Sequence, residues 1–147
     1  IWMLRRDPRL TPPRELRTAI DEGTARARVG TRWNSEQTTE LVLRAWARII
    51  GDIGTYRPYG ADDYMHHVTY RKRLDRMLGA LDELGHEEAH AWLKGELERL
   101  DEVFMERSVE DVEGLMLLEE KTDPRYWYLR RLPKDDNVVE HLRMIQP

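Results

Sequence analysis

The stretch that decides the fold is YRKRLDRMLGALDELGHEEAHAWLKGELERLDEVF, residues 70–104. Apolar side chains recur in it every three or four residues, the spacing that places them on one face of an α-helix. The recurrence is interrupted at Gly85, and a glycine at such a break readily adopts the left-handed conformation that ends a helix. We therefore expect two helices, 62–84 and 86–106, joined by a very short turn into an antiparallel hairpin.

Two further helices are expected before this hairpin. Residues 41–53 carry an apolar stripe that predicts a helix over 34–53, capped by Asn34 or Ser35 and packed against the hairpin. Thr11 and the prolines that follow it predict a short helix that ends at Gly23.

After the hairpin the sequence predicts two more elements. Ser108 and Asp111 resemble a capping box and favour a fifth helix over 108–118. Asn137 is the expected cap of a last helix. The segments IWMLRR (1–6) and YWYLRR (126–131) share the pattern W-x-L-R-R, which indicates either two short strand-like segments that pair or a coincidence.

These elements predict an all-α fold, a compact bundle of five or six helices with an antiparallel hairpin. A chain of 147 residues suits a single domain, 1–147. Within it we distinguish a basic N-terminal arm with a short helix (1–33), a helical core (34–120) and an aromatic, basic C-terminal segment (121–147).

The composition excludes several classes of protein. The chain has no cysteine, which excludes disulfides, thiolate zinc sites, iron–sulfur clusters and cysteine nucleophiles. No apolar run approaches the roughly 20 residues of a membrane span, and no stretch has the pattern of a signal peptide. We expect a soluble, cytoplasmic protein without a cofactor.

Charge is distributed unevenly along the chain. The net charge is −4, yet residues 1–33 carry eight basic and four acidic side chains, whereas 86–120 carry three basic and twelve acidic ones. A block this acidic repels phosphates, so nucleic acid is disfavoured as a partner. It favours a protein partner with a basic surface, or the basic arm of the same chain or of a second copy in a homo-oligomer.

One pattern points to a metal enzyme. His86-Glu87-Glu88-Ala89-His90 matches H-E-x-x-H, in which the two histidines hold zinc and the glutamate, here Glu87, activates a water molecule. A catalytic zinc needs a third protein ligand, and Glu110 is the candidate. Against this reading, the motif directly follows Gly85, where glutamates are explained by the positive end of the helix dipole. We therefore expect no metal, and keep a zinc-dependent hydrolase as the alternative.

A protein-binding surface is the main functional expectation, because no nucleophile, phosphate-binding loop or dinucleotide motif occurs. Its candidates are the aromatic and charged residues of YRPYGADDYMHH (56–67) and the acidic face of the fourth helix, with an aromatic ring near the C-terminus. They are Tyr56, Arg57, Tyr59, Asp62, Asp63, Tyr64, Glu98, Asp101, Glu102 and Trp127. The alternative for the tyrosines is that they merely cover one end of the bundle.

The sequence thus predicts a small protein-binding module. An immunity protein or antitoxin that masks a basic toxin surface is one concrete form, suggested by size, acidity and the lack of catalytic equipment.

Overall fold

The computed structural model describes residues 4–33 and 37–147. In these ranges the predicted all-α fold is confirmed, with α1 (Arg17–Arg28), α2 (Thr39–Asp52), α3 (Ala61–Val68), α4 (Tyr70–Glu83), α5 (Glu87–Glu106) and α6 (Asp136–Met144). Two strands, β1 (Ser108–Glu110) and β2 (Arg131–Pro133), form a small antiparallel sheet. Short 3-10 segments complete the fold: η1 (Leu4–Arg6), η2 (Pro8–Leu10), η3 (Arg14–Leu16), η4 (Glu119–Thr122) and η5 (Pro124–Arg130). None of the helices in the described ranges combines the length and apolar character needed to cross a bilayer.

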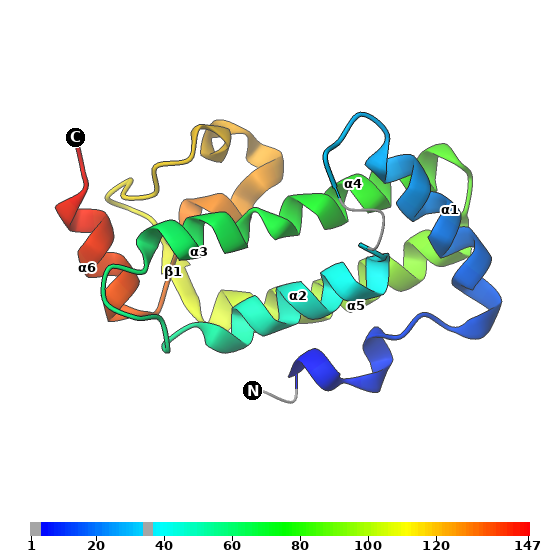
Figure 1. Cartoon of the computed structure of the whole chain (residues 1–147), viewed down its shortest axis with the longest axis horizontal. Coiled ribbons are helices and arrows are strands. Elements are labelled where there is room, and N and C mark those ends of the chain that lie inside the picture. Colours follow the sequence, from blue (N-terminus) through cyan, green and yellow to red (C-terminus); the bar gives the residue numbers. More distant parts are fainter. Residues whose placement is uncertain (1–3, 34–36) are drawn as a thin grey trace.

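Helices α4 and α5 form the predicted antiparallel hairpin (Figure 1). Gly85 lies between them with a φ of +73°, a conformation that L side chains rarely adopt. The predicted helix 62–84 is divided at Thr69 into α3 and α4, and the Thr69 hydroxyl donates to the His66 carbonyl oxygen (2.6 Å). Helix α2 packs against both α4 and α5, as expected.

The core contains a cluster of aromatic rings contributed by α2, α5 and η5. Trp46 of α2 is fully buried, and the ring centroids of Phe104 and Tyr128 lie 5.1 and 6.4 Å from its own. Burying each such side chain stabilises the fold by roughly 1.5–3 kcal/mol. Because the rings come from distant parts of the sequence, their packing fixes η5 against the helices.

The first helix continues past Gly23, so the prediction that it ends there is wrong. Gly23 lies inside α1, buried against α4. A Cβ at this position would lie 2.5 Å from Cδ2 of Leu81. The glycine is needed because it lets the two helices approach closely.

Helix caps differ from those predicted. Helix α2 begins after Thr38, whose hydroxyl accepts a hydrogen bond from the backbone N–H of Leu41 (3.1 Å). The proposed caps Asn34 and Ser35 lie outside the described residues. At α6 the cap is Asp135, two residues before the predicted Asn137.

Residues 108–118 do not form the predicted fifth helix. Ser108 donates its hydroxyl to the Phe104 carbonyl oxygen (2.7 Å) at the end of α5 and begins β1. The carboxylate of Asp111 accepts hydrogen bonds from two backbone N–H groups of the turn that follows (2.8 and 2.9 Å). Both side chains are therefore engaged elsewhere, and the resemblance to a capping box was misleading.

In the residues that the structure describes, the two W-x-L-R-R segments do not pair with each other. In the described part of the first segment, Leu4–Arg6 forms η1 and packs on α2, so the strand expected near the N-terminus is wrong there. The second segment lies mostly in η5, and only Arg131 enters a strand. That strand, β2, pairs with β1, so the strand expected near the C-terminus is confirmed.

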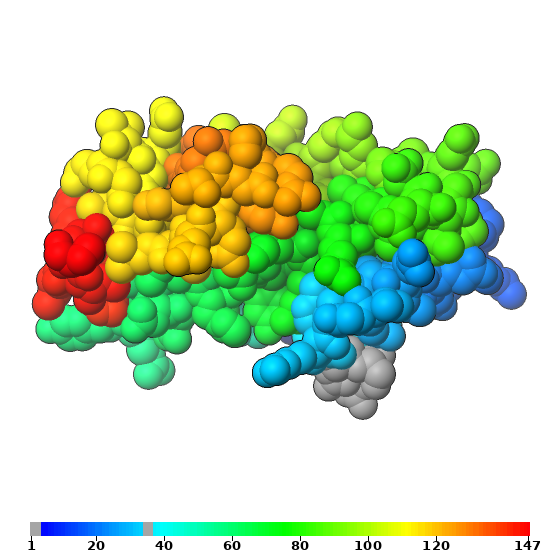
Figure 2. Space-filling view, turned by 90° about the horizontal axis from the view of Figure 1, so that it is seen from above, coloured from blue at the N-terminus to red at the C-terminus, as the bar shows by residue number. Residues whose placement is uncertain are grey.

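The segment from β1 to β2 lies across the outside of the hairpin. In Figure 2 its residues, yellow to orange, cover part of the green α3–α4 region. Leu115, Met116 and Leu129 of this segment are buried. Because this segment packs on the helices, the fold has a recess beside α5 that is lined by side chains.

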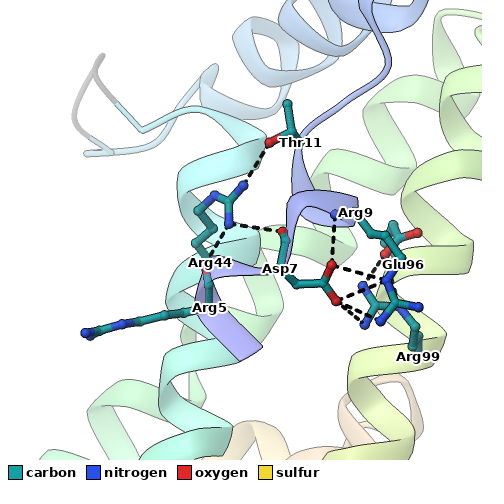
Figure 3. A network of polar contacts seen from close by, with 7 residues as sticks. All are labelled: Arg5, Asp7, Arg9, Thr11, Arg44, Glu96 and Arg99. Atoms are coloured by element: carbon teal, nitrogen blue, oxygen red, sulfur yellow. Dashed lines mark hydrogen bonds and ion pairs between the residues drawn. The ribbon is translucent and has the colours of Figure 1, made fainter. Parts of the chain in front are cut away.

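Residues 4–11 of the basic N-terminal arm, which alone we call the arm from here on, are held on the outside of α2 and α5 (Figure 3). Arg44 of α2 donates to two carbonyl oxygens of the arm, one of them that of Asp7 (3.3 Å). Arg99 of α5 donates to the Asp7 carboxylate (3.0 Å), and Arg9 pairs with the same carboxylate (2.8 Å). The arm is basic, yet it docks on its own chain through its acidic residue.

Replacing Gly23 with alanine tests the close packing of α1 on α4. Leu81 is buried and cannot swing away freely, so the overpacking caused by Gly23→Ala should lower the free energy of unfolding by about 1–3 kcal/mol. The higher helix propensity of alanine offsets roughly 1 kcal/mol of this loss. Urea denaturation measures this change. Gly95→Ala, in α5 with open space around it, is the matched control and should be neutral or stabilising. Equal effects of the two substitutions would contradict the packing argument.

The arm should respond to acid through Asp7. The hydrogen bond with Arg9, supported by Arg99, lowers the pKa of Asp7 from 3.8 to about 2 although burial opposes this. A pKa lower in the folded state gives stability that is present above about pH 4 and is lost as the pH falls toward 2.

We therefore expect Asp7→Asn to destabilise the protein at pH 6 and to make progressively less difference below pH 4, as measured by urea denaturation. Asp21→Asn removes an exposed carboxylate of α1 as the control. A difference between wild type and Asp7→Asn that stays constant from pH 6 to pH 2 would show that the ion pairs of Asp7 do not hold the arm.

Candidate functional site

A groove of about 930 Å³ runs between the C-terminal half of α5 and η5. We call it the α5–η5 groove. Four of the residues predicted for binding line it: Glu98, Asp101, Glu102 and Trp127. The charged lining consists of five acidic and three basic side chains: Glu98, Asp101, Glu102, Glu110, Asp111, Lys121, Arg130 and Arg131.

Only part of this charge is neutralised within the chain. Lys121 donates to carbonyl oxygens of the 111–118 turn, and Arg131 donates to the first residue of β1 (2.7 and 2.9 Å), so both cations hold the backbone around the groove. By contrast, the side chains of Glu98, Glu102 and Glu110 are exposed and make no ion pair or hydrogen bond with the described residues. These carboxylates are available to another molecule.

Asp101 lies where the groove meets a buried ionic network. Its carboxylate accepts a hydrogen bond from Nε1 of Trp46 (3.1 Å) and two from Arg71 (3.1 and 2.8 Å). Arg71 is only 5% exposed and pairs on its other side with Asp75, to which Tyr128 donates its hydroxyl (2.7 Å). The network joins α2, α4, α5 and η5, so it determines where the groove lies.

Two members of the network, Arg71 and Tyr128, keep one protonation state over the ordinary pH range. Burial by itself lowers the pKa of Arg71, but the hydrogen bonds and charges of Asp101 and Asp75 together outweigh it, and the pKa is raised overall. Burial, followed by the hydrogen bond to Asp75, raises the pKa of Tyr128 well above 10. Arg71 therefore stays cationic and Tyr128 stays a donor.

The predicted tyrosine-rich surface lies apart from the groove, at the loop before α3. Two side chains at the start of α6 fix this loop: Asp135, the cap of α6, accepts hydrogen bonds from the backbone N–H groups of Gly54 (2.7 Å) and Tyr56 (3.1 Å), and Asn137 donates to the Tyr56 carbonyl oxygen (2.7 Å). Tyr59 is 68% exposed and packs edge-on against another α6 side chain, with its backbone at a φ of +62°. Arg57, Asp62 and Asp63 are also exposed.

Tyr64 was wrongly predicted as a surface residue. It is fully buried, and its hydroxyl has no hydrogen-bond partner among the described residues. Its ring packs edge-on against Tyr56, whose hydroxyl lies 2.9 Å from Nδ1 of His67. Burial lowers the pKa of His67 and raises that of Tyr56, so this contact is made by neutral groups. Part of the tyrosine cluster therefore belongs to the core, in line with the alternative interpretation that the tyrosines cover one end of the bundle.

A second groove, of about 970 Å³, lies between the end of α1, α4 and η5. Its cations are already engaged: Arg26 pairs with Glu83, and Lys72 with Glu120. Arg76 donates to two backbone carbonyl oxygens at the end of α1. Since its cations already have partners within the chain, it is a weaker candidate than the α5–η5 groove.

The H-E-x-x-H residues do not come together with their proposed third ligand. His86 stands at the N-cap of α5, and its Nε2 lies 2.7 Å from a carboxylate oxygen of Glu22 in α1. Glu110 lies in β1, beyond the opposite end of this 20-residue helix, which is about 30 Å long. In residues 4–33 and 37–147, no three His, Asp or Glu side chains are grouped so that they could hold a metal ion.

Sequence reasoning missed two kinds of residue around the groove. Arg71 falls on the apolar stripe of its helix, and a charged residue in such a stripe could have signalled a buried ion pair; its partner Asp101 was predicted only as part of a binding surface. Met105 and Arg130 line the groove, but no local pattern marks them, because their positions depend on how η5 packs.

Arg71→Met tests the network that positions the groove. The change leaves Asp101 and Asp75 partly buried without their cation, so we expect a loss of about 3 kcal/mol or more in the free energy of unfolding. Arg143→Met breaks an exposed ion pair with Glu113 and should cost less than about 1 kcal/mol. Denaturant unfolding compares the two, and equal losses would mean that the buried network contributes no more than a surface pair.

Comparison with known proteins gives no relative. No protein-family model, no curated protein and no solved structure matches the chain. A function therefore has to be inferred from the residues of the α5–η5 groove and the surface around it.

Proposed function

We propose that this protein is a protein-binding module that recognises a partner with a basic surface through the α5–η5 groove. The observation that carries the proposal is the grouping of Glu98, Glu102 and Glu110, three exposed carboxylates without a partner in the described chain, around one groove. Carboxylates so placed attract and orient a basic partner, and they disfavour an acidic one.

Exposed apolar side chains also gather in the stretch of chain that starts at the groove residue Met105. Nine large apolar residues are exposed in the described ranges, and four of them fall within 105–117: Met105, Val109, Val112 and Leu117. Val112 is 86% exposed, so a partner that covered it would gain from the burial of its apolar surface. Apolar side chains next to charged ones are typical of protein–protein interfaces.

An immunity protein or antitoxin is the concrete form that we favour. Such a protein masks a basic, nucleic-acid-binding surface of a toxin, and an acidic groove that repels phosphates is suited to that task. The cytoplasm is the compartment where such a partner would be neutralised. No metal or cofactor is needed for this role.

A pair of charge reversals tests the proposal. Tagged wild-type protein should capture a partner from a lysate of its native cell, and Glu98→Lys/Glu102→Lys should weaken that binding roughly tenfold or more, because two attractions become repulsions. The matched control is Glu87→Lys/Glu88→Lys, the same charge change on exposed residues at the other end of α5. Quantification by mass spectrometry gives the ratio.

The proposal fails if the partner stays bound to the groove variant but is lost from the control. It also fails if every partner that depends on the groove has an acidic surface. Rising salt should weaken the binding of a true partner, since exposed charges are screened.

A further inference from the structure

We infer that the occupant of the α5–η5 groove is a short basic segment of a partner protein that inserts an apolar side chain against Trp127 and Met105. This inference rests on the proposed function and specifies how the partner binds. In this inference the groove recognises a linear segment of the partner and not a broad, folded surface.

The size of the groove favours a segment. Its volume of about 930 Å³ is at the upper end of the range for clefts that take a small ligand, which corresponds to a few side chains rather than a domain. The groove is bordered by α5 on one side and by η5 on the other, so an occupant lies between them.

Trp127 and Met105, which we call the floor of the groove, provide one rigid and one adaptable apolar contact. Trp127 is half-buried and is fixed by Phe104 and Tyr128, whose ring centroids lie 6.0 and 5.6 Å away. Met105 is 45% exposed, and its unbranched thioether adapts to the shape of the group that it contacts. A rigid ring beside a flexible side chain is suited to hold a single apolar side chain of a partner.

The occupant's charge is determined by four charged residues that we call the rim of the groove: Glu98, Glu102, Glu110 and Arg130. Glu98 and Glu102 stand one turn apart on α5, and Glu110 lies in β1. Arg130 is the one groove cation in the described chain whose side chain makes no hydrogen bond or ion pair. Three available carboxylates against one available cation favour lysine or arginine on either side of the apolar side chain.

A second copy of the chain is a poorer occupant. The basic segment that it could offer, the N-terminal arm, is already held by Arg44 and Arg99 through Asp7 (Figure 3). Of the two leucines in the described arm, Leu10 is fully buried against its own chain and Leu4 is partly buried against the core. For the arm of a second copy to enter the groove, these contacts would first have to break. We therefore propose a different protein as the occupant.

Three synthetic peptides test the inference on the whole chain. The probe is an amidated peptide of the order Arg-Lys-Leu-Leu-Arg-Lys-Gly. In one matched control Ser-Ser replaces Leu-Leu, and in the other four Glu replace the basic residues. Titration followed by ¹⁵N–¹H NMR should shift the indole resonance of Trp127 and the amides of 98–105, with the serine peptide roughly tenfold weaker and the acidic peptide not binding.

Two protein variants make the result specific to the floor and the rim. Met105→Ser, at a half-exposed position, should weaken the leucine peptide severalfold and leave the serine peptide unchanged. Glu98→Lys/Glu102→Lys should weaken both peptides.

Each other outcome overturns the inference in a recognisable way. Equal binding of the leucine and serine peptides would show attraction by charge alone. No peptide binding, in a protein whose captured partner still depends on Glu98 and Glu102, would show recognition of a folded surface and leave the proposed function standing. Concentration-dependent self-association by light scattering, with the groove closed to peptides, would identify a second copy as the occupant.

Discussion

The fold depends on the pairing of one buried cation. Arg71 lies inside the protein, where an unpaired charge would be very unfavourable, and it is neutralised by Asp101 of α5 and Asp75 of α4. This requirement holds α4 and α5 at a fixed separation. Because Tyr128 hydrogen-bonds to Asp75 and packs on the Arg71 guanidinium, 5.0 Å from its ring centroid, the same requirement also brings η5 to the helices.

The groove is a consequence of this arrangement. Asp101 belongs both to the network and to the groove lining, and Trp127 is the chain neighbour of Tyr128. When η5 packs through Tyr128, the ring of Trp127 is placed opposite the acidic side of α5. The interior thus uses some carboxylates for stability, while Glu98, Glu102 and Glu110 make no ion pair or hydrogen bond with the described residues.

The helices were predictable from sequence because apolar periodicity and the glycine at 85 are local signals. The errors share one physical cause, which is that tertiary contacts override local patterns. Gly23 permits close packing instead of ending a helix, and Ser108 bonds to the end of α5 instead of starting a new one. Four predicted site residues meet in the groove, whereas Tyr64 is buried, since a tyrosine beside a loop cannot be assigned to core or surface from spacing alone.

The central claim is that this groove, positioned by Arg71, is where a basic partner binds. Hydrogen exchange of the chain with and without its captured partner tests it most directly, because it maps the covered backbone without any substitution. The account predicts that the partner slows exchange in residues 98–112 and 124–131. Slowed exchange confined to α1 or to the loop before α3, with the groove unchanged, would contradict it.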